Sequence, residues 1–126
     1  MLHIGIVACS TEGAALCYRT ISLEGAQMVG CHDHPEISLH SHALARYMKC
    51  IDGGDWAGVA ELMLSSAEKL AKSGADFLIC PDNTIHQAFD LVEHRSPRPS
   101  TARRAKSPKR RSAAGSSASP CWARAI

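Results

Sequence analysis

Apolar residues in this chain form short runs that alternate with longer segments of helical periodicity. Residues 2–8 are a nearly continuous β-favouring run, which is typical of a strand buried on both faces of a parallel sheet. Residues 36–41 alternate between apolar and polar side chains, and residues 76–80 form a third apolar run. We predict a strand at each of these three segments.

Helices are predicted between and after the strands. The first covers about residues 11–28, with Ser10 or Thr11 as its N-cap. The clearest helical pattern follows Asp55, where apolar residues recur at three- and four-residue steps: Trp56, Val59, Ala60, Met63, Ala67, Leu70 and Ala71. A last helix is predicted over about residues 84–93. Strands that alternate with helices indicate an α/β fold built on a parallel three-stranded sheet, half of a doubly wound domain.

Charge divides the chain into two regions of opposite sign. All twelve acidic residues lie within residues 1–95 beside six Lys or Arg, so that region has a net charge of −6. Residues 96–126 contain eight Lys or Arg and no acidic residue, in a background of Ser, Ala and Pro. Such a segment buries too little apolar surface to offset its loss of chain entropy. We predict a folded half-domain over residues 1–95 and a basic disordered tail over residues 96–126.

The basic tail has two interpretations. Charge blocks of this kind often bind nucleic acid or another acidic surface. A shifted reading frame would also produce the abrupt change at residues 96–99, where a further strand is expected, and we favour this second interpretation. Nucleic-acid binding ranks last among our hypotheses because no aromatic residue is interleaved with the basic residues of 98–111.

The six cysteines indicate a reducing compartment. They show no C-x-x-C spacing, and no secretory signal precedes them. The apolar run at residues 2–8 is too short for a signal core or a membrane span. We expect reduced thiols, a cytoplasmic location and no membrane partner.

Residues 79–86 carry more reactive groups than any other segment of this length. A thiol, a carboxylate, an amide, a hydroxyl and an imidazole follow one another there: Cys80, Asp82, Asn83, Thr84 and His86. Ser10 and Thr11 follow the first strand in a similar position. Because the carboxyl ends of parallel strands meet at one edge of a sheet, both loops are expected to face one crevice that suits a carboxylate or phosphate. Helix capping alone also explains the polar residues of either loop, and a buried inert thiol is the default for Cys80.

Two other kinds of site find little support. Neither loop contains the G-x-G-x-x-G pattern or a phosphate-loop ending, which argues against a dinucleotide or NTP enzyme. The two His-x-His pairs have no matching set of spaced Cys or His partners, so we interpret them as exposed loop histidines rather than metal ligands: His32, His34, His40 and His42.

Four segments, in order along the chain, resemble the motifs of one family. Residues 5–21 resemble a Gly-rich loop followed by a Tyr-Tyr-Arg helix, and residues 34–37 look like the entry to the second strand. Segments within residues 55–77 look like the long helix and third strand. Pro81-Asp82-Asn83-Thr84-Ile85-His86 is similar to the active-site motif Pro-Cys-Asn-Thr-x-His. The family is that of the aspartate/glutamate racemases, and the resemblance covers residues 2–95.

The resemblance implies an isomerase that removes and returns the α-proton of an amino acid without pyridoxal phosphate, metal or other cofactor. It implies a substrate held between two similar α/β halves, each supplying one cysteine. By motif, Asn83 and Thr84 hold the substrate carboxylate with help from Ser10 and Thr11. The motif also places His86 as a supporting residue.

Asp82 stands where the family has its first cysteine and is therefore the candidate catalytic residue. A free aspartate titrates near pH ~3.9 and a thiol near ~8.5, which makes the carboxylate a weaker base by roughly 6 kcal/mol. The tail also has no counterpart of the family's C-terminal half, and Cys121 has no family context. We expect this truncated chain to be inactive or nearly so.

Two further hypotheses remain open. The chain could be a non-catalytic half-domain that binds a small acid, or one that binds a partner through its unfinished sheet edge. The expected partners are therefore a small-molecule amino acid and a second copy of the chain at that edge.

Overall fold

The protein is described by a computed structural model that covers residues 2–96 and 124–125. Three strands pair in parallel in the order β2-β1-β3: β1 (Ile4–Ala8), β2 (Ile37–Ser41) and β3 (Phe77–Cys80). A two-residue strand, β4 (Arg124–Ala125), pairs with β3 in the antiparallel direction. The predicted α/β fold on a parallel three-stranded sheet is confirmed.

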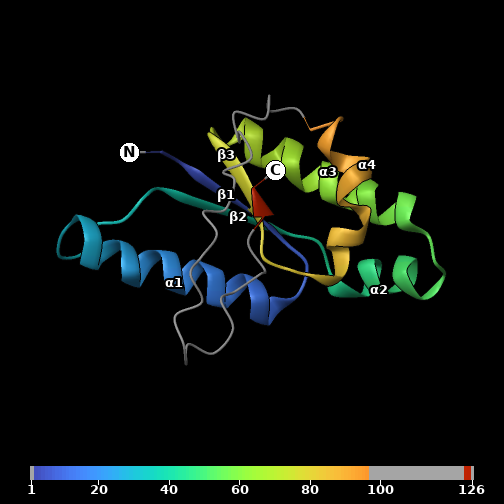
Figure 1. Cartoon of the computed structure of the whole chain (residues 1–126), viewed down its shortest axis with the longest axis horizontal. Coiled ribbons are helices and arrows are strands. Elements are labelled where there is room, and N and C mark those ends of the chain that lie inside the picture. The colour runs from blue at the N-terminus through green and yellow to red at the C-terminus, as the bar shows by residue number, and fades with distance from the viewer. Residues whose placement is uncertain (1, 97–123, 126) are drawn as a thin grey trace, which may run out of the picture.

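Four α-helices and one 3-10 helix surround this sheet in the described part of the chain: α1 (Thr11–Val29), α2 (Leu44–Asp52), α3 (Trp56–Lys72), the 3-10 helix η1 (Thr84–Ala88) and α4 (Phe89–Glu93). Helix α1 lies on one side of the sheet, and α3 lies on the other with α2 and α4 beside it (Figure 1). None of the described helices is long and apolar enough to cross a membrane.

The main core lies between the sheet and α3. Val7 and Leu78 on the strands pack with Val59 and Met63 on α3, and all four side chains are fully buried. Gly5 permits close packing of β1 against its neighbours, since a Cβ there would lie 2.5 Å from the Leu78 side chain of β3 and 3.3 Å from the Leu70 Cβ of α3. The periodicity predicted for the long helix therefore corresponds to its buried stripe.

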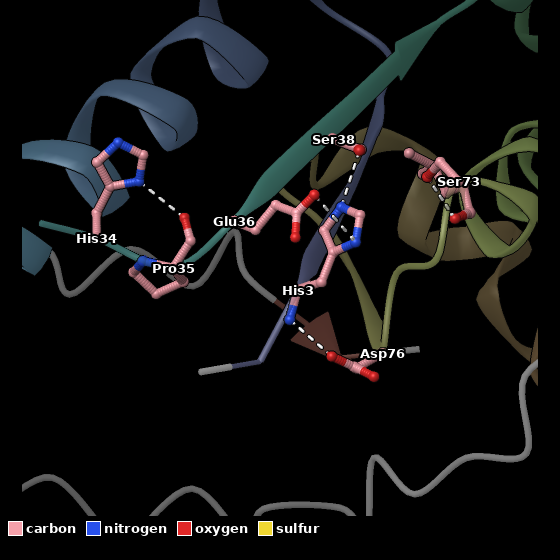
Figure 2. A network of polar contacts seen from close by, with 8 residues as sticks. His3, His34, Pro35, Glu36, Ser38, Ser73 and Asp76 are labelled. Carbon is pink, nitrogen blue, oxygen red and sulfur yellow. Dashed lines mark hydrogen bonds and ion pairs between the residues drawn. The ribbon is translucent and has the colours of Figure 1, made fainter.

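The amino ends of the three strands are held together by His3 (Figure 2). Its backbone N–H donates to Asp76 Oδ2 at 2.7 Å, and the Asp76 N–H donates to the His3 carbonyl at 2.8 Å. The His3 Nε2 atom lies 2.8 Å from Ser38 Oγ on β2. These contacts fix the alignment of the strands, and with it the positions of the loops at their carboxyl ends.

Two elements differ from the sequence prediction. Helix α2 was not predicted, because Tyr47 is its only buried side chain and no polar N-cap marks its start. The last predicted helix begins as the 3-10 helix η1 and becomes α-helical only at Phe89. The predicted tail, residues 96–126, lies largely outside the described residues, which include only residue 96 and the two residues of β4 from it.

Candidate functional site

The loops that follow β1 and β3 meet at the carboxyl edge of the sheet. The two strands are neighbours, and the backbone N–H of Ser10 donates to Asp82 Oδ2 at 3.2 Å. This hydrogen bond joins two loops that are far apart in the sequence. The structure therefore brings together the two polar segments that the sequence analysis singled out.

Asp82 is held by backbone donors from both sides of its carboxylate. Oδ2 accepts the Ser10 N–H, and Oδ1 accepts the Thr84 N–H at 3.2 Å. Asp82 is half-buried, and these two hydrogen bonds fix the position of its carboxylate at the sheet edge.

Ser10 caps helix α1. Its Oγ accepts a hydrogen bond from the backbone N–H of Gly13 at 3.2 Å, so the hydroxyl serves as the N-cap of this helix. Gly13 allows the two loops to approach closely, since a Cβ there would lie 3.3 Å from the Pro81 carbonyl oxygen. Thr11 is the first residue of α1, and its side chain is exposed.

The remaining motif residues lie at the start of η1. Asn83 and Thr84 are exposed, so their side chains are accessible to a ligand. His86 is half-buried, and its Nε2 lies 2.8 Å from the carbonyl oxygen of Cys80. Because a carbonyl only accepts, Nε2 carries the hydrogen of this bond. His86 therefore fixes the end of β3 and the start of the Asp82 loop.

Two buried thiols lie beside the carboxylate. Burial raises the pKa of Cys9 to about 12, with a smaller contribution from the negative charge of Asp82. Burial also raises the pKa of Cys80 to about 12. Both groups are therefore neutral thiols near pH 7, and Cys80 is fully buried at the end of its strand.

Tyr47 is a site neighbour that the sequence analysis missed. It projects from α2 and is fully buried, and its hydroxyl has no hydrogen-bond partner among the described residues. Burial raises the pKa of Tyr47, and the nearby Cys9, Cys80 and Asp82 add to that rise. The Ser66 hydroxyl is close enough to oppose this rise, although the pair does not reach hydrogen-bond geometry. In the sequence, Tyr47 could be noticed only as the one Phe, Trp or Tyr residue between residues 42 and 54.

The second His-x-His pair is not an exposed loop pair. His40 belongs to β2, and its Nδ1 lies 2.8 Å from Ser66 Oγ. His42 follows the strand with its ring centroid 4.8 Å from that of His40. Both side chains are partly buried because the β2–α2 segment packs beside α3. In the first pair, His32 is exposed and His34 is half-buried. No group of three or more metal-ligating residues occurs in the described part of the chain.

A separate cavity of about 540 Å³ lies between α2 and α3. Its lining includes charged residues of both signs and none of the site residues predicted from the sequence: Arg46, Lys49, Asp55 and Glu61. The polar loops at the sheet edge, rather than this cavity, therefore carry the candidate chemistry.

The fold resembles solved structures of racemase-type proteins. A proposed Asp/Glu racemase from Yersinia pestis shares 27% sequence identity and a TM-score of 0.73, over 79% of this chain and 44% of that one. An aspartate racemase homologue from Pyrococcus horikoshii OT3 shares 25% identity and a TM-score of 0.67, over 79% of this chain and 43% of that one. No family model matches the chain.

The described chain therefore has a racemase-like α/β fold, which confirms at the level of the fold the resemblance seen in the sequence. It spans less than half the length of each of these two proteins.

Proposed function

We propose that this chain carries one half of the site of a cofactor-independent amino-acid racemase or related isomerase. The observation that supports this most directly is the Ser10–Asp82 hydrogen bond, which joins the loops after β1 and β3 within a racemase-like fold. In this proposal the ligand is a small amino acid at the carboxyl edge of the sheet.

The proposal assigns a role to each motif residue. The exposed side chains of Asn83 and Thr84 bind the α-carboxylate, with Thr11 beside them. Asp82 faces the α-carbon from one side and is the group that exchanges a proton with it. Ser10 and His86 hold the two loops in place through their hydrogen bonds.

Racemisation needs a proton to leave one face of the α-carbon and another to arrive on the opposite face. If the Asp82 carboxylate takes the α-proton, the electron pair stays on the carbon, and the same carboxyl group can return the proton only to the face it left. The opposite face then needs a proton donor, and in the reverse direction it needs a base. Burial raises the pKa values of Cys9 and Cys80 to about 12, so each thiol is a weak donor and is not ionised near pH 7. We therefore propose that the 126-residue chain binds an amino acid without inverting it.

Proton NMR in D₂O with L- and D-aspartate and L- and D-glutamate tests this proposal. Binding is expected to broaden or shift ligand resonances, and no inversion is expected within the limit of detection. An ordinary racemase rate from the purified chain would disprove the proposed half-site. The absence of binding by all four amino acids would also disprove it.

A non-catalytic acid-binding half-domain is the second candidate. It is favoured by the hydrogen bonds that engage both Asp82 oxygens, because these give the carboxylate a purely structural use. Asp82→Asn separates the two, with Asp90→Asn on the exposed face of α4 as the matched control. A catalytic Asp82 predicts that α-proton exchange falls about 100-fold or more in Asp82→Asn. If Asp82 is only structural, Asp82→Asn is expected to have a lower unfolding midpoint than wild type, and neither protein is expected to exchange the α-proton.

A further inference from the structure

The cavity between α2 and α3 has no part in the proposed function. The two helices pack side by side (Figure 1). The volume of the cavity, about 540 Å³, lies within the range of roughly 300–1,000 Å³ that is common for small-ligand sites. One face of each helix lines it, with Arg46, Lys49 and Cys50 from α2 and Glu61, Leu62 and Ser65 from α3.

Gly58 on α3 leaves the cavity open beside the thiol of Cys50. A Cβ at this position would lie against the Asp55 carboxylate and 2.9 Å from Cys50 Sγ. Cys50 is a half-buried free cysteine that lines the cavity. Its thiol is therefore a reporter of what enters the cavity.

The two carboxylates of the cavity already have positive partners in the protein. Glu61 Oε1 accepts a hydrogen bond from Nη1 of Arg95 at 2.6 Å. Asp55 Oδ1 accepts the Gly58 N–H at 2.8 Å, at the amino end of α3, where the helix dipole favours a negative charge. Neither carboxylate therefore needs a cation from a ligand.

The two cations of the cavity lack such partners. Neither Arg46 nor Lys49 forms an ion pair with a carboxylate in the described part of the chain, and residues 97–126 contain no acidic side chain. Nη1 of Arg46 lies 3.1 Å from Nδ1 of His42. The pKa of His42 is lowered, first by burial and then by neighbouring basic side chains, so its ring is neutral near pH 7. Both positive charges therefore remain available to an anion.

The arrangement of these cations suits a phosphate group. The guanidinium of Arg46 is a planar fork that can bind two oxygens of one oxyanion. Lys49 lies three residues further along α2, on the same side of the helix. A phosphate monoester carries a charge of about −1.5 to −2 near pH 7, which matches two cations better than the single charge of a carboxylate. Leu62 supplies an apolar wall for the organic part of such a ligand.

We propose that the cavity between α2 and α3 binds a small phosphate monoester. Arg46 and Lys49 bind its phosphate group, Ser65 donates a hydrogen bond to it, and Leu62 contacts its organic part. The cavity contains none of the residues of the loops after β1 and β3, so this site is independent of the proposed function.

Isothermal titration calorimetry of the 126-residue chain with phenyl phosphate tests the proposal. Arg46→Gln and Lys49→Gln are each expected to weaken binding about ten-fold, because each removes a charged hydrogen-bond donor to the phosphate. Lys72→Gln is the matched control, since Lys72 is exposed in the last turn of α3 and does not line the cavity. It is expected to keep the wild-type affinity.

Alkylation of Cys50, followed by peptide mass spectrometry, gives a second measurement. Iodoacetate is an anion and iodoacetamide is neutral, so the cations of the cavity should raise the ratio of their rates at Cys50. Cys31 is the internal control because it is exposed and lies outside the cavity. The ratio is expected to be higher at Cys50 than at Cys31, and to fall in Lys49→Gln. Phenyl phosphate is expected to slow alkylation at Cys50 alone.

Three results would overturn the proposal. The first is that wild type does not bind phenyl phosphate. The second is that Lys49→Gln binds it as tightly as wild type, which would place any binding at other basic residues. The third is that succinate, a dicarboxylate, binds as tightly as phenyl phosphate, which would contradict the assignment to phosphate. Lys49 is exposed, so Lys49→Gln is expected to keep the wild-type unfolding midpoint, and it decides the outcome if Arg46→Gln is destabilised.

Discussion

At the scale of single residues, burial decides which groups at the sheet edge carry charge. The thiols of Cys9 and Cys80 are buried, and the pKa of each is raised to about 12. Asp82 is instead half-buried, and two backbone N–H groups donate to its carboxylate. The charge beside β1 and β3 therefore comes from the carboxylate, in contrast to the cysteine that the related motif carries at this position.

The buried thiols predict a loss of stability in alkaline solution. Burial raises the pKa of Cys9 from 9.0 to about 12 and that of Cys17 from 9.0 to about 11. The unfolded chain therefore releases these protons at lower pH than the folded chain. The stabilisation is complete below about pH 9 and is lost as the pH rises toward these folded-state values.

Urea denaturation between about pH 8 and about pH 10.5 measures this effect. The free energy of unfolding is expected to fall with pH, and Cys17→Ala is expected to reduce the slope. Cys31→Ala, at an exposed cysteine, is the control and should keep the wild-type slope. Equal slopes in both variants would contradict the assignment to buried thiols.

At the scale of elements, the helices differ in which group accepts hydrogen bonds from the backbone N–H groups of their first turn. Asp55 caps α3, with its Oδ1 accepting the Gly58 N–H at 2.8 Å. Helix α2 begins after Ala43, whose side chain cannot accept a hydrogen bond. This difference explains why the sequence pattern predicts α3 clearly and misses α2, although α2 carries the buried Tyr47.

The missing cap on α2 can be supplied. Ala43 has φ −58° and ψ 132°, an extended conformation that suits an N-cap residue. Ala43→Asp is expected to raise the free energy of unfolding by about 1 kcal/mol, and Asp55→Ala to lower it by about 1 kcal/mol. Chemical denaturation of the two variants checks both signs. A destabilising Ala43→Asp would show that the helix start is satisfied in another way.

At the scale of the whole molecule, the two sides of the sheet are covered unequally. Helix α3 and its neighbours bury one face, whereas Leu39 on β2 remains 44% exposed. Strand β2 lies at the end of the strand order, with no further strand beside it in the described part of the chain. We propose that this open edge is where copies of the chain associate, since unpaired strand edges readily add another strand.

Leu39→Lys tests the proposed association. A charged side chain in the middle of an edge strand disfavours pairing with another strand, so this variant is expected to shift the protein toward monomer. Leu91→Lys on α4 is the matched control, because Leu91 is similarly exposed at 49% and lies away from the edge. Sedimentation velocity over a range of concentrations gives the readout. A wild-type protein that stays monomeric throughout would contradict the proposal.

Several features of this protein follow from the sequence by itself. The three strands, α1 and α3 were predictable because each has a local period of apolar residues that needs no distant partner. The Pro81–His86 motif was found for the same reason, since its residues are neighbours in the chain.

Only the tertiary structure decided what surrounds that motif. The Ser10–Asp82 bond exists because β1 and β3 pair, and Tyr47 approaches the thiols because α2 packs beside α3. The raised pKa values of Cys9 and Cys80 likewise depend on burial, which segments distant in sequence create together. Local patterns specify elements, whereas hydrogen-bond partners and desolvation depend on how those elements pack.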